Sequence, residues 1–206
     1  MPSFFAIAAL SLAGLQAAPA TPGGGESPPP AVSSAALVAA APELASLPGV
    51  TLVGYPVQGR SPRAIRESID ERRPKPPQGE EAFDARVDWR YQTRWQSGPS
   101  GACDPATVEV EMTIVVTLPE LTTRAALDRR ERERWDRYFT ALIGHEHNHV
   151  RVALAGAEQL RTFMRNAPDC TTMQAAQAQI SASIVAANAA YDEQTRHGRT
   201  EGATYP

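Results

Sequence analysis

Cysteine, lysine and histidine are scarce in this chain. Its 206 residues include two cysteines and four histidines, and Lys75 is the only lysine among 20 basic residues. Because 23 acidic residues give a net charge of -3, the chain lacks the positive excess typical of proteins that bind nucleic acids. We therefore expect no nucleic-acid partner.

No hydrophobic run is long enough for a stable membrane span. The run over residues 4–15 is interrupted by Ser11 and Gly14, and it falls short of the roughly 18 apolar residues that a spanning helix needs. Small residues follow it, as at a signal-peptide cleavage site, although no Lys or Arg occurs before Arg60. We predict a signal peptide over residues 1–20 and an exported protein, either periplasmic or extracellular.

A single folded domain is expected after a linker. Residues 21–48 are rich in Pro, Gly, Ser and Ala and carry almost no charged or aromatic side chains. Such a segment has little surface to bury against the entropy lost on ordering. We predict a linker over 21–48, in which 35–41 could form a helical turn or two, and one domain over 49–206.

Hydrophobic periodicity within that domain predicts an α+β fold. Two-residue alternation or apolar runs indicate strands, and spacing of three and four residues indicates helices. The expected strands lie within 51–59, 87–91 and 107–118, the last ended by Pro119, and the expected helices span about 61–73, 123–166 and 172–196. We expect a small antiparallel sheet packed on the long helix, which pairs with an antiparallel C-terminal helix. The strand over 107–118 could offer an edge to an extended substrate or lie inside the sheet, and the sequence leaves both open.

The most specific chemical signal is an H-E-x-x-H pattern in the long helix, formed by His145, Glu146 and His149. Residues four apart lie one turn apart on the same face, so both imidazoles can reach one metal ion. Glu146 is rotated by about 100 degrees from His145 and can approach a metal-bound water as a base. His147 points away from both ligands. The pattern therefore predicts a zinc site with Glu146 as the catalytic residue.

A third zinc ligand must come from another part of the chain. The residue six positions after His149 is Ala155, and Glu158 lies on the opposite side of the helix. In an antiparallel hairpin the returning helix regains the level of His149 near residues 189–197. We predict His197 as the third ligand, with Asp192 as the alternative or as a hydrogen-bond partner of a ligand imidazole.

The two cysteines suggest a disulfide. Cys103 and Cys170 are an even pair in a chain expected to be exported, and neither has a second cysteine nearby in sequence, as a zinc ligand would. We expect a bond between the loop before the 107–118 strand and the turn of the helical hairpin.

The order of these features resembles the predicted secreted zinc-dependent proteases of bacteria, an uncharacterised family with an H-E-x-x-H motif. The resemblance covers the chain from about Tyr55 to its C-terminus. It rests on YPVQG (55–59), DWRY (88–91), Cys103, Leu118-Pro119, Trp135, Phe139, Leu142, the H-E-x-x-H motif, Cys170 and YDEQTRHG (191–198). It implies a zincin-like metallopeptidase fold, with His145 and His149 as ligands and Glu146 as the catalytic base.

We therefore expect a zinc-dependent metallopeptidase that hydrolyses a peptide or protein substrate, with Glu146 activating a zinc-bound water. One alternative is a non-catalytic zinc-containing envelope or binding protein, in which a fourth protein ligand would close the site. Another is a zinc amidase that acts on cell-wall peptides with the same chemistry.

Overall fold

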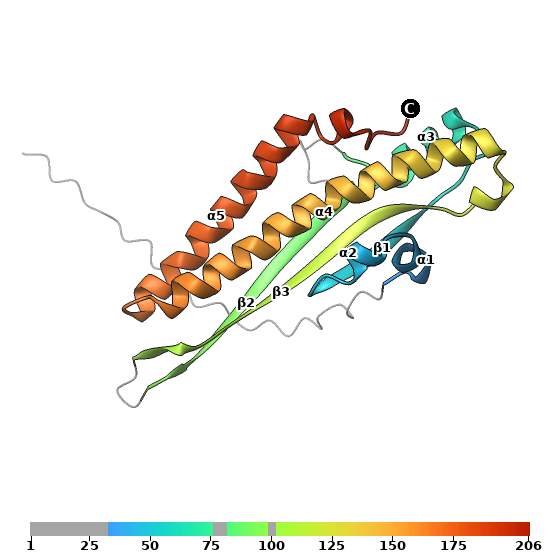
Figure 1. Cartoon of the computed structure of the whole chain (residues 1–206). Helices are drawn as coiled ribbons and strands as arrows, with labels where there is room; N and C mark the ends of the chain where they lie inside the picture. Colours follow the sequence, from blue (N-terminus) through green and yellow to red (C-terminus); the bar gives the residue numbers. More distant parts are fainter. Residues whose placement is uncertain (1–32, 76–81, 99–101) are drawn as a thin grey trace, which may run out of the picture. The chain divides into compact units, whose positions relative to one another are not determined.

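The computed structural model describes residues 33–75, 82–98 and 102–206. The signal peptide predicted over 1–20 lies outside these residues. The described residues form one compact unit, in which a three-stranded sheet packs against a helical hairpin (Figure 1). The elements in chain order are α1 (Ala35–Ala40), α2 (Pro42–Ala45), β1 (Val50–Val57), α3 (Pro62–Arg72), β2 (Arg86–Ser97), β3 (Cys103–Leu121), η1 (Arg124–Ala126), α4 (Arg129–Arg165), α5 (Cys170–Thr195) and η2 (Arg199–Glu201).

The sheet has the order β1-β3-β2 and is mixed, which corrects the expectation of an antiparallel sheet. β1 runs parallel to β3, and β2 runs antiparallel to it. Over residues 114–117, β3 is paired with both neighbours. That part of the predicted 107–118 strand therefore offers no free edge to a substrate, and the outer strands are β1 and β2.

Pro119 does not end β3, although the sequence predicted that it would. The strand continues to Leu121, and its residues from Ile114 to Leu121 pair with β1, with Pro119 opposite Tyr55. Ile114 donates its N–H toward β1, so the N–H groups of even-numbered residues face β1 and those of odd-numbered residues face β2. Pairing with β2 ends at Thr117. The missing N–H of proline therefore costs no ladder hydrogen bond.

The segment over 33–48 is folded, so the predicted linker is wrong for this part of the chain. Leu37 of α1 and Leu44 of α2 are each 2% exposed and belong to the core. Ser34 caps α1, and its hydroxyl donates to Glu120 of β3 over 2.8 Å. Two leucines and one capping serine anchor a segment whose average composition is typical of a linker. Residues 21–32 lie outside the described residues.

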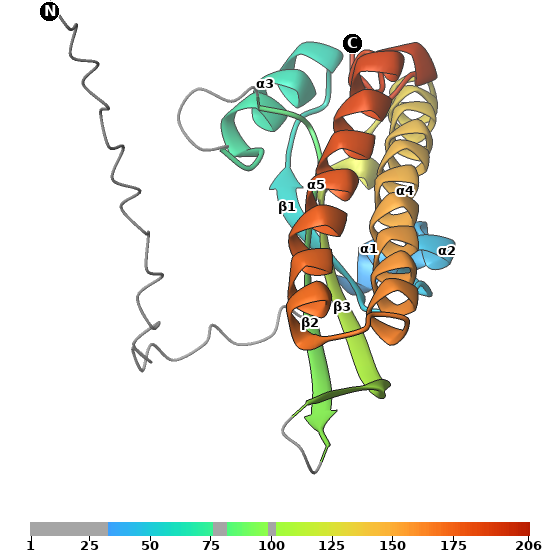
Figure 2. The same ribbon diagram turned by 90° about the vertical axis from the view of Figure 1, so that its left-hand side faces the viewer.

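Three side-chain caps set the starts of the longer helices, as the sequence predicted for α3. Ser61, Asp128 and Asp169 accept hydrogen bonds from the backbone N–H three residues ahead, at the starts of α3, α4 and α5. α4 packs along β3, and α5 returns beside α4 as the predicted antiparallel hairpin (Figure 2). The apolar face of α4 supplies much of the core, including Trp135, Tyr138, Leu142, Val150, Leu160 and Met164.

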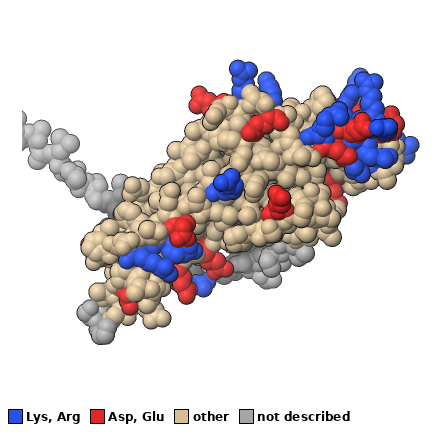
Figure 3. Space-filling view, viewed as in Figure 1, with Lys and Arg blue, Asp and Glu red and all other residues tan. Residues whose placement is uncertain are grey.

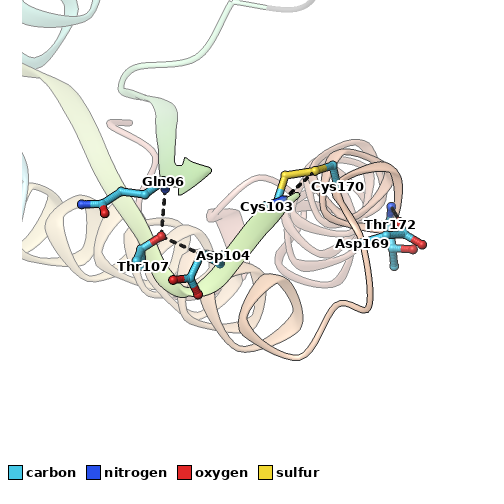
Figure 4. Close-up of a disulfide and its surroundings, with 7 residues drawn as sticks. All are labelled: Gln96, Cys103, Asp104, Thr107, Asp169, Cys170 and Thr172. Carbon is cyan, nitrogen blue, oxygen red and sulfur yellow. Dashed lines mark hydrogen bonds between the residues drawn. A yellow bond between two sulfur atoms is a disulfide. The ribbon is translucent and has the colours of Figure 1, made fainter. Parts of the chain in front are cut away.

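A disulfide joins Cys103 to Cys170, as predicted (Figure 4). It links the first residue of β3 to the first residue of α5, next to the capping residue Asp169. The bond therefore holds the turn of the helical hairpin against one end of the sheet.

Removing this disulfide should destabilise the fold. The bond closes a loop with a sequence separation of 67 residues. We expect the double variant Cys103→Ala/Cys170→Ala to lose about 4 kcal/mol of unfolding free energy, mainly because its unfolded chain is less restricted. Urea denaturation of both proteins measures this difference. An unchanged midpoint with an unchanged slope would contradict the expectation.

Charged side chains on the face drawn in Figure 3 include both signs. Acidic and basic groups are mixed at its right-hand end, where α4 begins in Figure 1. The ion pair of Arg129 with Glu133 belongs to this part of α4. Within the described ranges, no helix combines the length and apolar character needed to cross a membrane.

Candidate metal centre

The hairpin of α4 and α5 brings three potential metal ligands together. His145 and His149 lie one turn apart on α4, and Asp192 faces them from the last turn of α5. The Nε2 atoms of the two histidines are 3.2 Å apart. Asp192 Oδ1 lies 3.2 Å from Nε2 of His145 and 3.1 Å from Nε2 of His149. Three donor atoms from two helices thus form a nearly equilateral triangle.

The outer nitrogen of each histidine is held by an oxygen acceptor. Nδ1 of His145 lies 2.8 Å from Glu201 Oε2, and Nδ1 of His149 lies 2.9 Å from Asn188 Oδ1. An oxygen acceptor at Nδ1 requires the proton on that nitrogen, so Nε2 of the neutral ring presents its lone pair to the triangle. The two hydrogen bonds therefore orient both rings as ligands.

The two Nε2 atoms and the Asp192 oxygen carry lone pairs that repel one another at this distance. A proton on an imidazole or a cation between the three atoms would offset the repulsion. Burial alone lowers the pKa of His145, but hydrogen bonds with Asp192 and Glu201 outweigh it and raise the pKa above its usual value. The pKa of His149 is raised in the same way, by Asp192 and Asn188 against burial. Burial would raise the pKa of Asp192, yet hydrogen bonds with both imidazoles hold it well below its usual range. The site thus favours protons on its imidazoles, and a metal ion would replace them.

The dimensions of the triangle suit a zinc ion. Tetrahedral zinc with bonds of about 2.0–2.1 Å separates its ligand atoms by about 3.3–3.4 Å. The observed separations of 3.1–3.2 Å are close to that spacing. Two imidazoles and one carboxylate are also a donor set that catalytic zinc sites use. Among the described residues, no fourth His, Cys, Asp or Glu joins this group.

A tight turn after α5 carries Glu201 to His145. Arg196 and His197 adopt φ values of 53° and 54°, and Gly198 follows at 74°. A Cβ atom on Gly198 would lie 2.8 Å from the Cβ of Ala203 and 3.2 Å from the His145 ring, so a side chain there would crowd the ligand. The turn leads into η2, which places the Glu201 carboxylate on Nδ1 of His145.

Tyr191 of α5 completes this network. It is partly exposed, and its ring stacks on His145 with centroids 5.0 Å apart. Its hydroxyl donates to Glu201 over 2.9 Å and accepts from Asn148 over 2.8 Å. Tyr191 thereby braces the carboxylate that orients His145.

His197, predicted as the third ligand, does not join the triangle, and Asp192, predicted as the alternative, is its third member. Nδ1 of His197 lies 4.0 Å from Asp192 Oδ1, and its side chain is 47% exposed. The left-handed turn after α5 carries the His197 ring away from α4 and onto Phe83, with centroids 4.6 Å apart. Asp192, still within the helix, faces both imidazoles.

Glu146 is buried beside the triangle without a hydrogen-bond partner for its carboxylate among the described residues. Burial raises its pKa to about 7, while the neighbouring His149 and His145 act in the opposite direction. A carboxyl group whose pKa lies near neutrality is suited to take up and release a proton. Its environment therefore fits the predicted role of a general base.

A pocket of about 360 Å³ opens onto Glu146 and the three donor residues. Its opposite wall comes from residues 82–87, which Asp84 holds in place. Both carboxylate oxygens of Asp84 accept from Arg66, over 2.8 and 2.6 Å, and one also accepts from Tyr138 of α4 over 2.9 Å. The carbonyl oxygen of Asp84 accepts from Tyr55 of β1 over 2.6 Å. The wall is thus fixed to α3, α4 and β1 at once.

Glu201 and Asn188 are the contributors to this site that the sequence analysis missed. Asn188 precedes Asp192 by four residues, so helical spacing was the available signal for it. Glu201 lies beyond the end of α5, and its position depends on the left-handed turn. Helical periodicity in the sequence therefore could not predict that Glu201 lies beside His145.

Loss of the Glu201 carboxylate should weaken metal binding. The variant Glu201→Ala leaves Nδ1 of His145 without its acceptor, and partners of this kind contribute about 10- to 100-fold to metal affinity. Competitive zinc titration against a chromophoric chelator measures the change. Glu193→Ala, at an exposed position on the same helix–turn segment, is the control. Equal affinities of the two variants would contradict the role of Glu201.

A comparison with known families identifies the family of this chain. The model of a family described as "Bacterial protein of unknown function (DUF922)" matches residues 53–198, more than half of the chain. The chain belongs to this family. The matched segment contains His145, Glu146, His149, Asn188 and Asp192, whereas Glu201 lies just beyond it. No curated protein and no solved structure matches the chain.

Proposed function

We propose that the protein is an exported zinc-dependent metallopeptidase with a zincin-like site. The observation that carries the proposal is the triangle of His145, His149 and Asp192, with the buried carboxylate of Glu146 beside it at the base of a pocket. Three protein donors leave one position of a tetrahedral ion open, as catalytic zinc requires. Exported location is supported by the Cys103–Cys170 bond, because disulfides persist in oxidising compartments.

Zinc in this site would be held by the two Nε2 atoms and the Asp192 carboxylate. When bound, the ion supplies Lewis-acid polarisation of the scissile carbonyl and acidification of a water molecule. The Nδ1 hydrogen bonds to Glu201 and Asn188 keep the imidazoles fixed while this chemistry proceeds.

Glu146 acts as the proton carrier in the proposed reaction. Its carboxylate takes a proton from the attacking water and later passes it to the leaving amine. Two features support this role: the carboxylate has no competing hydrogen bond among the described residues, and burial brings its pKa to about 7. Its position one residue after His145 keeps it out of the ligand set.

Two other functions, a structural zinc site and a zinc amidase, can be distinguished from the proposed peptidase by experiment. A structural zinc site would fill its fourth position with a protein ligand, and no fourth donor joins the three within the described residues. An amidase would cleave cell-wall peptides with the same residues. The donor set favours a hydrolytic site over a structural one, and substrate profiling separates the two hydrolases.

The proposal is tested by metal analysis of the purified mature protein, followed by digestion of a broad peptide library with and without a chelator. We expect about one zinc per chain and cleavage that the chelator abolishes and added zinc restores. Cleavage confined to cell-wall peptides would support the amidase. Bound zinc without cleavage of any peptide would contradict the proposal.

A further inference from the structure

Five arginines line the pocket that opens onto the metal centre. They are Arg66, Arg73, Arg86, Arg196 and Arg199. Three acidic side chains line the same pocket: Asp84, Glu146 and Asp192. Arginine is therefore the commonest charged residue of the cleft, and the partners of each arginine decide whether its charge is available to a ligand.

Three of these arginines are bound to carboxylates of the protein itself. Arg66 makes paired hydrogen bonds to Asp84 and also contacts Asp70. Arg73 lies 3.2 Å from Asp70 and 3.5 Å from Asp84, and Arg86 lies 2.6 Å from Asp88. Their charges are used to hold the wall of the pocket.

Arg196 and Arg199 differ from the other three. Both are exposed, and neither forms an ion pair with any acidic residue in the described part of the chain. Two of the three acids that share the pocket already have partners: Asp84 binds Arg66, and Asp192 faces the two imidazoles. The third, Glu146, is buried and forms no ion pair with either arginine in the described part of the chain. Among the residues that the structure describes, these two guanidinium groups of the pocket therefore have no carboxylate partner.

The backbone places these two arginines beside the metal centre. Gly198 lies between them in the sequence, and a Cβ atom on Gly198 would lie 3.2 Å from the His145 ring. The turn that carries them is fixed by hydrogen bonds from the N–H of His197 to the Asp192 carbonyl and from the N–H of Arg199 to the Arg196 carbonyl. These hydrogen bonds fix the backbone of Arg196 and Arg199 relative to Asp192.

We propose that Arg196 and Arg199 form a subsite for a carboxylate of the peptide substrate. This inference rests on the proposed peptidase function and adds the substrate class: peptides with a carboxylate close to the scissile bond. The planar guanidinium group matches a carboxylate through two parallel hydrogen bonds. The carboxylate could belong to the C-terminus of the peptide or to an Asp or Glu side chain, and the experiment below separates these sources.

Binding without turnover gives the direct test. The zinc-loaded Glu146→Gln variant is titrated by calorimetry with matched peptides that end in a free acid or an amide and contain either Asp or Asn. We expect the peptides with a carboxylate to bind more tightly and to lose affinity as the salt concentration rises. Preference for the free acid identifies the C-terminus as the source, and preference for Asp over Asn identifies a side chain.

Adding Arg196→Gln and Arg199→Gln to that variant should weaken binding of the carboxylate peptides by about tenfold, as expected for two partly solvated charge pairs. Binding of the amidated Asn peptide should not change. The control carries Arg130→Gln and Arg137→Gln, two exposed arginines without ion pairs among the described residues and outside the pocket. Arg196→Lys with Arg199→Lys keeps the charge and should retain most of the affinity if the turn stays intact.

The inference is overturned if the parent binds charged and neutral peptides equally, or if the Gln and control variants bind the carboxylate peptides equally. Zinc titration of each variant ensures that a loss of peptide binding is not a loss of metal. Failure of the proposed function has a different signature. Wild-type zinc-loaded protein would then cleave no peptide, whatever the calorimetry of the Glu146→Gln variant reports.

Discussion

Replacing Glu146 with glutamine should lower kcat for peptide hydrolysis by about 10²- to 10⁴-fold, the contribution that a positioned general base makes. Glutamine has nearly the same shape but cannot take a proton from the attacking water. The ligands His145, His149 and Asp192 are untouched, so zinc should bind with unchanged stoichiometry. The amide also carries no charge and therefore no cost of burying a carboxylate at this site.

The measurement compares kcat, KM and zinc content of wild-type and Glu146→Gln proteins. Glu158→Gln is the matched control, because Glu158 lies on α4 at an exposed position. We expect this control to behave as wild type. Hydrolysis by Glu146→Gln at the wild-type rate, with zinc bound, would show that another group moves the proton.

Replacing Asp192 with alanine should lower zinc affinity by more than 100-fold. Residues that only orient a ligand contribute about 10- to 100-fold, and a direct ligand contributes more. The carboxylate of Asp192 lies 3.1–3.2 Å from both Nε2 atoms, so its loss leaves only two of the three donors. His145→Ala and His149→Ala should act in the same direction.

His197→Ala provides the contrast that separates the two candidate ligands. Its ring stacks on Phe83 and stays outside the triangle, so this variant should bind zinc with an affinity close to that of wild type. Competitive titration gives the affinities, and circular dichroism checks that each variant is folded. A larger loss for His197→Ala than for Asp192→Ala would make His197 the ligand and contradict the assignment.

The hairpin and the adjacent placement of His145 and His149 could be predicted because they depend on local spacing. The H-E-x-x-H pattern needs only the helical repeat, and the antiparallel return of α5 follows from the length of the two helices around their turn. The same count placed residues 189–197 opposite His149, and Asp192 lies there. The disulfide was predictable because the chain offers only one pairing.

The remaining features depend on contacts that sequence spacing does not encode. Asp192 faces the two imidazoles and His197 does not, because two residues with positive φ follow α5, neither of them glycine. Glu201 is brought to His145 by that same turn.

The strand pairing in the sheet and the folding of residues 33–48 also could not be predicted from sequence spacing. The parallel pairing of β1 with β3 depends on tertiary packing, as does the burial of Leu37 and Leu44 in an alanine-rich segment. β3 continues through Pro119 because β2 pairs with β3 only as far as Thr117, which only the strand register reveals.

The central claim is that His145, His149 and Asp192 hold one zinc ion beside Glu146. The most direct measurement is a crystal structure of the zinc-loaded protein with diffraction data collected on both sides of the zinc absorption edge. The account predicts one anomalous peak at about 2.0–2.2 Å from Nε2 of each histidine and from a carboxylate oxygen of Asp192. A peak bonded to His197 in place of Asp192, a fourth protein ligand, or no peak at this site would contradict it.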